Sequence, residues 1–141
     1  MKISIITVVY NDKEGLQKTI DSIKSLNYHN IEFIVIDGGS SDGTVELIQK
    51  YTSSIDYWVS EADDGIYDAM NKGIKTANGD WVNFMNAGDY FVNENVLNEM
   101  DFTANKKVDI LYGYKIQKGK LFYPMNIKNL EIGVIFGNHQ S

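Results

Sequence analysis

The length of 141 residues suits a single domain, and we expect residues 1–141 to form one domain with a substantial core. The chain has no cysteine, which excludes a disulfide framework and thiolate metal sites, and its net charge of -6 argues against a general nucleic-acid binder. All 13 basic residues are lysines, so lysine, backbone N–H groups or a metal ion would have to meet any bound phosphate.

Residues 1–10 form a short apolar stretch that predicts a buried strand. Polar residues 11–14 follow at once, without the small-residue cleavage pattern of a signal peptide. No run in the sequence approaches the ~20 apolar residues of a membrane-spanning helix. We therefore expect a cytoplasmic protein.

Strand and helix patterns alternate along the first part of the chain. Nearly continuous β-branched runs at 3–9 and 31–36 predict central strands, and residues 12–26 between them have apolar side chains at helical spacing. The alternation continues, in order, with a helix at 44–51, a strand at 57–60, a helix at 66–76 and a strand at 80–85. Such alternation predicts an α/β fold with a mostly parallel sheet and right-handed crossovers.

Three finer expectations concern the second half of the sequence. On the helix at 66–76, we expect Ile66, Met70 and Ile74 to face inward, followed by Ala77. A short helix is predicted at 93–100. Residues 108–114 and 121–123 are predicted as antiparallel strands joined across a Lys118-Gly119-Lys120 turn.

Polar and acidic side chains follow each predicted parallel strand. Asp12 follows the first strand, Asp37 the second, residues 61–65 (EADDG) the third and residues 86–89 (NAGD) the fourth. Ligands of open α/β sheets bind at this edge, and converging carboxylates repel one another unless a cation sits among them. Oxygen donors without cysteine favour Mg²⁺ or Mn²⁺, and a hard cation beside glycine-rich loops suggests a phosphorylated ligand such as a nucleotide.

Each acidic position also has a purely structural interpretation. For Asp12, an N-cap of the first helix is slightly favoured over a ligand contact. Asp42 fits a turn that caps the next helix, and Asp63 and Asp89 fit turn residues. Asp37 favours a functional role because it precedes two glycines, where the backbone comes close to a neighbour.

Taken together, the motifs resemble a known family. Residues 4–11 (SIITVVYN) and 32–44 (EFIVIDGGSSDGT) are similar to the N-terminal half of the inverting family 2 glycosyltransferases, which have the GT-A fold. Residues 60–74 (SEADDGIYDAMNKGI) resemble a bacterial subgroup that builds capsule, colanic-acid-type or O-antigen polysaccharide. Residues 78–89 (NGDWVNFMNAGD) resemble the strand that leads into the metal motif of the family. The resemblance implies a Rossmann-like sandwich with helices on both faces of the sheet.

The resemblance also implies the roles of individual residues. Thr7, Tyr10 and Asn11 match positions that line the base and ribose of the nucleotide, and Asp37 matches the acid that hydrogen-bonds the base. Lys72 matches a position that faces the nucleotide, and Asp89 would hold Mg²⁺ or Mn²⁺ on the diphosphate. Here the chain departs from the family pattern, because Asn86 and Gly88 replace two usual carboxylates. The full set of expected substrate-binding residues is Thr7, Tyr10, Asn11, Asp37, Gly39, Asp68, Lys72, Asn86, Ala87 and Gly88.

The activity that the resemblance implies is sugar transfer with inversion. The donor would be a nucleotide-diphospho-sugar, with UDP as the default, and the acceptor a glycan or lipid-linked glycan at the inner face of the cytoplasmic membrane. The general base is expected beyond Ser141, so we expect a C-terminally truncated domain that binds nucleotide and transfers sugar slowly or not at all. Peripheral membrane association would then depend on regions missing from this chain.

Two other classes of function were weighed against this one. A dinucleotide-binding oxidoreductase is disfavoured because Gly38, Gly39 and Gly43 follow the second strand and do not spell GxGxxG after the first. A non-catalytic module that binds a nucleotide-sugar stays open, because no general base is evident.

Overall fold

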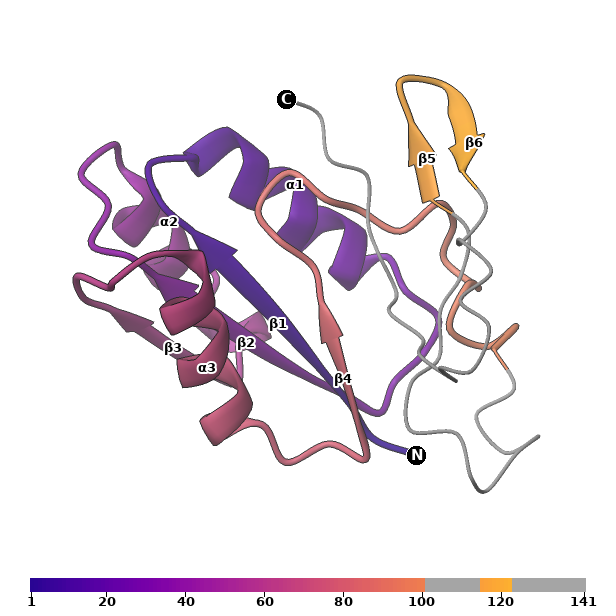
Figure 1. The fold of residues 1–141 in the computed structure, drawn as a ribbon. Helices are drawn as coiled ribbons and strands as arrows, with labels where there is room; N and C mark the ends of the chain where they lie inside the picture. Colours follow the sequence, from indigo (N-terminus) through magenta and orange to yellow (C-terminus); the bar gives the residue numbers. More distant parts are fainter. Residues whose placement is uncertain (101–114, 123–141) are drawn as a thin grey trace, which may run out of the picture.

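The structure is a computed structural model, and it describes residues 1–100 and 115–122. The described chain alternates strands and helices before a separate hairpin (Figure 1). The elements, in chain order, are β1 (Ile3–Val9), α1 (Lys13–Lys24), β2 (Ile31–Asp37), α2 (Thr44–Lys50), a 3-10 turn (Thr52–Ser54), β3 (Tyr57–Ser60), α3 (Ile66–Thr76), β4 (Trp81–Phe84), β5 (Lys115–Gln117) and β6 (Lys120–Phe122).

The first four strands form one parallel sheet in the order β3-β2-β1-β4. Ile3 of β1 pairs with Ile31 of β2 on one side and with Trp81 of β4 on the other. The chain moves outward from β1 to β3 and then returns through α3 to the far side of β1. The carboxyl ends of β1 and β4 therefore mark the switch point at which ligands of such sheets bind.

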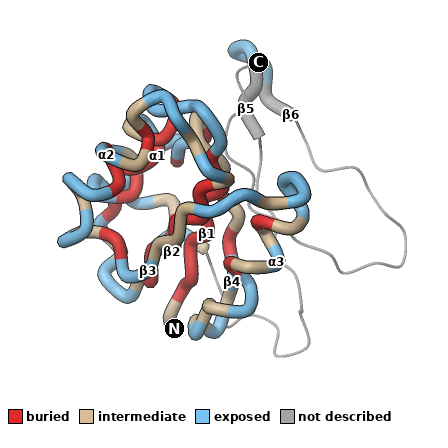
Figure 2. Tube along the Cα trace, turned by 90° about the vertical axis from the view of Figure 1, so that its left-hand side faces the viewer, coloured by how far each residue is buried: buried red, intermediate tan, exposed pale blue. Residues whose placement is uncertain are grey.

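Helices cover both faces of the sheet, as the family resemblance implies. On one face Ile5 and Phe33 pack with Leu16 of α1 and Ile48 of α2. On the other face Ile6, Val8, Ile34 and Ile36 pack with Ala69 of α3. Alternate residues of each strand thus serve opposite cores, and Figure 2 shows β1 and β2 buried inside an exposed rim of loops.

Helix α1 follows the prediction closely. It begins after Asp12, whose carboxylate accepts a hydrogen bond from the Gly15 N–H at 3.0 Å. Its apolar face, Leu16, Ile20 and Ile23, is buried. A capped first turn and a buried apolar stripe are what stabilise a helix of this length in a domain.

Helix α3 presents a different face to the sheet from the one predicted. Ala69 and Gly73 are buried, whereas Ile66 is 47% exposed and Ile74 is 48% exposed, so the prediction for these two isoleucines is wrong. The physical reason is the close approach of the helix at Gly73, where a Cβ would lie 2.4 Å from Ile6 Cγ2. A helix that packs through small residues leaves its larger side chains at the flanks.

The prediction of a helix at 93–100 is also wrong. The structure has turns there, in which the Asn93 side chain accepts a hydrogen bond from the Asn95 N–H at 2.8 Å. Short polar side chains compete in this way with helical backbone bonds. The predicted strand at 108–114 lies outside the described residues. The strand predicted at 121–123 appears over residues 120–122 as β6, which pairs antiparallel with β5.

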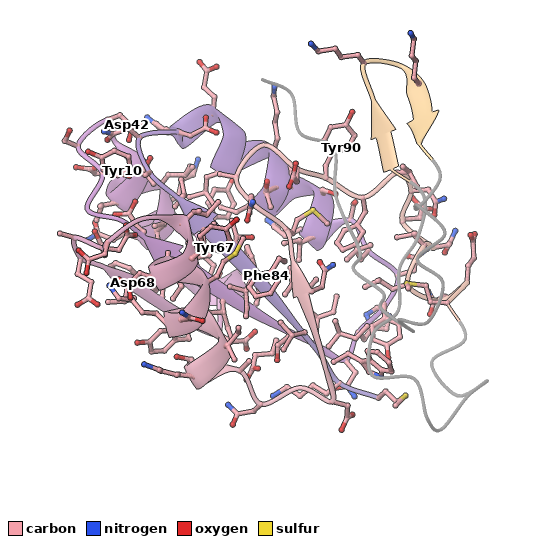
Figure 3. All side chains as sticks on the ribbon, viewed as in Figure 1. Tyr10, Asp42, Tyr67, Asp68, Phe84 and Tyr90 are labelled. Carbon is pink, nitrogen blue, oxygen red and sulfur yellow. The ribbon has the colours of Figure 1, made fainter. Side chains whose placement is uncertain are left out.

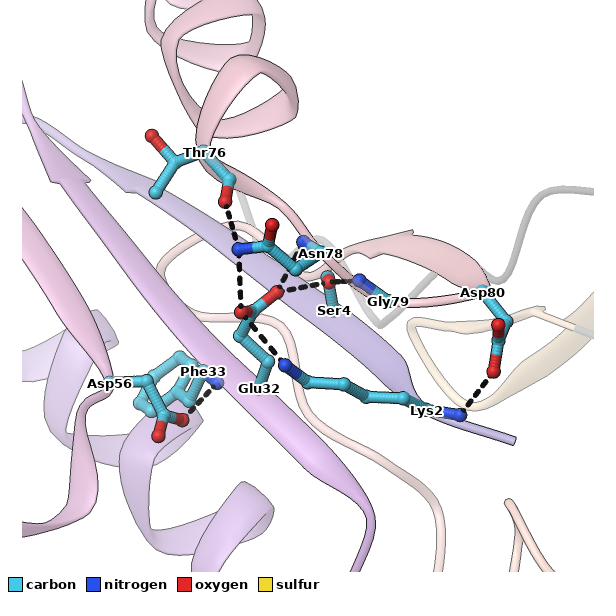
Figure 4. Close-up of polar contacts among 9 residues, drawn as sticks. All are labelled: Lys2, Ser4, Glu32, Phe33, Asp56, Thr76, Asn78, Gly79 and Asp80. Atoms are coloured by element: carbon cyan, nitrogen blue, oxygen red, sulfur yellow. Dashed lines mark hydrogen bonds and ion pairs between the residues drawn. The ribbon is translucent and has the colours of Figure 1, made fainter.

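A buried carboxylate joins the amino end of the sheet to the segment that follows α3 (Figure 4). Glu32 of β2 accepts hydrogen bonds from Asn78 N at 2.7 Å, Ser4 Oγ at 2.5 Å and Lys2 Nζ at 3.1 Å. Burial alone would raise the pKa of Glu32, but the bonds from Asn78, Ser4 and Lys2 lower it from 4.5 to about 2. This network lies at the end of the strands away from the switch point, so we assign it a structural role.

Candidate active site

A cavity of about 280 Å³ lies at the carboxyl ends of β1 and β4. Four segments enclose it: the end of β1, the loop before α3, the first turns of α3 and the loop after β4. The lining residues are Val8, Val9, Tyr10, Asp12, Asp63, Gly65, Ile66, Ala69, Asn86 and Ala87. The cavity therefore sits at the switch point that the sheet order defines.

Two carboxylates, those of Asp12 and Asp63, give the cavity an acidic rim. Asp12 Oδ1 accepts the hydrogen bond that caps α1, and Asp63 Oδ1 accepts one from the Gly65 N–H at 2.9 Å. A Cβ on Gly38 would lie 2.7 Å from Asp63 Oδ2, so the glycine lets the loop after β2 approach this carboxylate. Both acids are thus held by their loops at the rim.

The loop at residues 86–89 supplies the third side of the cavity. Its backbone extends the sheet by one bond, from the Ala87 N–H to the Val8 carbonyl at 3.1 Å. The Asn86 Oδ1 atom is buried and has no hydrogen-bond partner among the described residues. Asn86 and Ala87, both predicted from the resemblance, therefore lie at the cavity together with Tyr10.

Helix α1 holds this loop from behind through Thr19. The Thr19 hydroxyl donates to the Asp89 carbonyl at 2.7 Å and accepts from the Gly88 N–H at 3.1 Å. Gly88 has a φ of +91°, a conformation that favours glycine. The Asp89 side chain is 4% exposed, and Asp89 is not among the residues that line the cavity.

Asp37 and Asn11 shape the neighbouring loop at residues 38–42. The Asp37 carboxylate is fully buried and accepts hydrogen bonds from Gly39 N at 3.2 Å, Ser40 N at 3.0 Å and Ser60 Oγ at 2.5 Å. Asn11 N donates to Ser40 Oγ at 2.7 Å. None of Asn11, Asp37 and Gly39 lines the cavity. Their contacts hold the loop that borders it.

Lys72 and Asp68 contact each other rather than the cavity. Lys72 Nζ lies 3.0 Å from Glu61 Oε1 and 3.4 Å from Asp68 Oδ2, and it also donates to the Ala62 carbonyl. The hydrogen bonds that Lys72 donates to Glu61 and then to Asp68 raise the pKa of Lys72, whereas the bond from the Asp64 N–H and then the contact with Lys72 lower the pKa of Asp68. Figure 3 shows Asp68 on α3 and Tyr10 beyond the end of β1. The Lys72–Glu61 ion pair and the bond to the Ala62 carbonyl therefore join the loop at 61–65 to α3, whereas the Lys72–Asp68 pair lies within the helix.

Sequence reasoning missed several residues of the cavity wall and placed one residue one position away. Thr7 is fully buried and does not line the cavity, whereas its neighbours Val8 and Val9 do. The position of residues 61–65 after the third strand predicted that they lie at this edge, but Asp63 and Gly65 were not among the expected binding residues, because Asp63 was also explained as a turn residue.

The cavity offers oxygen donors that suit a hard divalent cation. The carboxylates of Asp12 and Asp63 and the orphaned Asn86 Oδ1 are the ligand types that Mg²⁺ and Mn²⁺ prefer. Among the described residues no group of three or more acidic, histidine or cysteine side chains gathers into a metal site. A cation here would therefore complete its coordination with water or with oxygens of a bound ligand.

The amino end of α3 provides a second feature for an anionic ligand. Gly65 is the N-cap, and no side chain caps this helix. The first N–H groups of a helix, together with its dipole, favour a negative group. Gly65 and Ile66 lie at the cavity, so a phosphate bound there would contact the N–H groups at the end of α3 directly. A cation would lie between the phosphate and the acidic rim.

One further observation concerns membranes. None of the helices in residues 1–100 and 115–122 is long and apolar enough to span a bilayer.

The sequence was compared with known families and proteins. The family model described as Glycosyl transferase family 2 matches residues 4–134. An uncharacterized glycosyltransferase of Mycobacterium tuberculosis is 44% identical over 96 residues, which cover 67% of this chain and 37% of that protein. WfaP of Escherichia coli, a UDP-Glc:alpha-D-GlcNAc-diphosphoundecaprenol beta-1,3-glucosyltransferase, is 33% identical over 118 residues, which cover 82% of this chain and 47% of WfaP. The chain thus spans less than half the length of either relative.

Solved structures show the same fold. TarS 1–349 of S. aureus in complex with UDP-GlcNAc matches with a TM-score of 0.63 and 25% identity, over 70% of this chain and 29% of TarS. Glucosyl-3-phosphoglycerate synthase of Mycobacterium tuberculosis, in complex with Mn²⁺, UDP and glucosyl-3-phosphoglycerate, matches with a TM-score of 0.53 and 25% identity, over 63% of this chain and 35% of that one. With the parallel sheet, these likenesses confirm the expected GT-A fold.

Proposed function

The chain belongs to glycosyl transferase family 2, and on that premise we propose that it is the donor-binding part of an enzyme that transfers a sugar from a UDP-sugar to a glycan or lipid-linked acceptor. The observation that carries the proposal is the cavity at the β1–β4 switch point, with its acidic rim and the uncapped end of α3. WfaP, with its UDP-Glc donor and diphosphoundecaprenol acceptor, and TarS with UDP-GlcNAc support the donor and acceptor classes. A site of action at the inner face of the cytoplasmic membrane is part of the proposal.

The nucleoside would lie against the end of β1. Val8 and Val9 provide apolar surface and Tyr10 an aromatic ring, and the loop at residues 38–42 borders them. In this proposal Asn11, Asp37 and Gly39 act by shaping that loop, with Thr7 behind it in the sheet. Asp68 and Lys72 act by holding the loop at 61–65.

The diphosphate would lie between the loop at residues 86–89 and the amino end of α3. Asn86, Ala87 and Gly88 would approach it from one side, and Gly65 and Ile66 from the other. A divalent cation, when bound, compensates the charge that develops on the UDP leaving group. Inversion would follow if the acceptor hydroxyl attacked the sugar from the face opposite UDP.

Ligand-dependent thermal stability of the 141-residue chain tests the nucleotide. We expect UDP with Mn²⁺ to raise the melting temperature, because a ligand at about 100 times its Kd adds about 2.7 kcal/mol to the free energy of unfolding. UDP with EDTA should raise it less. The comparison ligands are GDP, which tests the base, and NAD, which tests the oxidoreductase alternative. Stabilisation by NAD and none by any nucleoside diphosphate would contradict the proposed function.

Asp89 is the metal ligand that the family resemblance predicts, and Asp89→Ala tests it. With UDP and Mn²⁺, we expect the melting temperature of this variant to rise no more than it does with UDP and EDTA, because the substitution removes a carboxylate next to Asn86–Gly88. The smaller rise with UDP and EDTA should be the same as in the wild-type chain. The Asp89 side chain is buried, so the variant's melting temperature without ligand must be measured beside the shift. An unchanged Mn²⁺-dependent shift would remove Asp89 from the metal site.

A further inference from the structure

We infer that Asp12, the residue that caps α1, also binds the divalent cation of the donor site. The inference rests on the proposed function, since it assigns a ligand to the cation expected there. It starts from the position of the Asp12 carboxylate, which lines the cavity together with Asn86 and Ala87. Oδ1 is occupied by the Gly15 N–H, whereas Oδ2 accepts no hydrogen bond from the residues that the structure describes.

The space around Gly15 shows that the Asp12 carboxylate lies close to the backbone of the first turn of α1. A Cβ at this position would come within 2.1 Å of Asp12 Oδ2 and 2.7 Å of Oδ1, far inside van der Waals contact. Glycine inside a helix costs about 1 kcal/mol relative to alanine. The absence of a Cβ at Gly15 therefore lets the Asp12 carboxylate lie this close to the first turn.

The carboxylate is thereby directed toward the loop that follows β4. A Cβ on Gly88 would lie 3.8 Å from Asp12 Oδ2. The Thr19 hydroxyl fixes this loop on α1, the same helix that Asp12 caps. The free carboxylate oxygen and residues 86–88 therefore belong to one framework and face the same space.

The second donor is the orphaned amide oxygen of Asn86. A buried oxygen without a hydrogen bond costs about 1–3 kcal/mol, and Asn86 is a residue of the cavity wall, so a cation bound beside it would supply the missing partner. A cation between Asp12 Oδ2 and Asn86 Oδ1 would satisfy that oxygen and neutralise part of the acidic rim. Its remaining positions would be taken by Asp89, the ligand that the family resemblance predicts, and by water and phosphate oxygens, which Mg²⁺ commonly keeps.

The variant Asp12→Asn separates the two roles of Asp12. Asparagine caps helices as well as aspartate does, so the melting temperature of the ligand-free chain should hardly change. We expect its Kd for Mn²⁺ in the presence of saturating UDP to rise about ten-fold or more, since even the loss of a side chain that only positions a metal ligand commonly costs about 10–100-fold in metal affinity. The free Mn²⁺ signal in an EPR titration measures this Kd directly, and UDP affinity in EDTA should be unchanged.

Glu14→Gln is the matched control. It removes the same charge from the same exposed first turn, but Glu14 does not line the cavity, so its Mn²⁺ affinity should stay at the wild-type value. Asp12→Ser, a second capping residue without charge, should behave as Asp12→Asn does. Two outcomes would overturn the inference and leave the proposed function intact. One is a wild-type Mn²⁺ affinity in both Asp12 variants, and the other is UDP binding by the wild-type chain that does not depend on Mn²⁺. Absence of nucleotide and Mn²⁺ binding in the wild-type chain would overturn both.

Discussion

Glu32 shows how one side chain can link stability to pH far from the active site. The pKa of its carboxylate in the folded protein is about 2, below the value of 4.5 for a free glutamate. A lowered folded pKa means that the stabilisation is complete above about pH 4.5 and is lost as the pH falls toward 2. Because the donors are Ser4, Lys2 and Asn78, the effect connects β1, β2 and the segment after α3.

The variant Glu32→Gln tests this link. The glutamine amide would turn its NH₂ group toward one of the donors that Glu32 accepts from, so that one hydrogen bond is lost. We therefore expect the free energy of unfolding at pH 7 to fall by about 2 kcal/mol. The difference from wild type should shrink as the pH falls from 5 to about 2.5, in urea unfolding followed by circular dichroism. Glu46→Gln, on the exposed side of α2, should change the stability at pH 7 by less than about 0.5 kcal/mol. A difference that stayed constant across this pH range would exclude the proposed linkage.

Among the elements, α3 is the one whose packing departs most from its sequence pattern. Apolar spacing predicted α1 correctly, because Leu16, Ile20 and Ile23 are its contact residues. In α3 the contact is made by Ala69 and Gly73, which carry little hydrophobic signal. The decisive feature, the approach of Gly73 to Ile6, joins residues far apart in the chain and is invisible to local periodicity.

Gly73→Ala measures how tightly α3 approaches the sheet. Helix propensity alone would make alanine more stable by about 1 kcal/mol. The new Cβ would lie 2.4 Å from Ile6 Cγ2, a methyl group attached close to the backbone, so we expect a net loss of about 1–3 kcal/mol in thermal or urea unfolding. Asn71→Ala, at an exposed position of the same helix, should be neutral or slightly stabilising. Stabilisation by Gly73→Ala would mean that the helix can move away at no cost.

For the molecule as a whole, topology was more predictable than the site. Alternating strands and helices gave the parallel sheet and its carboxyl edge, and with them the place of the cavity. Which side chains enter the cavity depends on the direction of each residue at a strand end, and this direction alternates from one position to the next. Of the predicted binding residues, Tyr10, Asn86 and Ala87 line the cavity, whereas Asp37 accepts hydrogen bonds from its own loop. Their roles toward the nucleotide stay predictions.

Thr19 gives the loop after β4 a property that matters before any ligand arrives. One hydroxyl of α1 contacts the backbone on both sides of the Gly88–Asp89 peptide, so the loop is ordered when the chain folds. A segment that is already ordered has little conformational entropy left to lose on binding. The donor site would then be preorganised on this side, and any adjustment to the sugar would fall to the wall formed by the loop at 61–65.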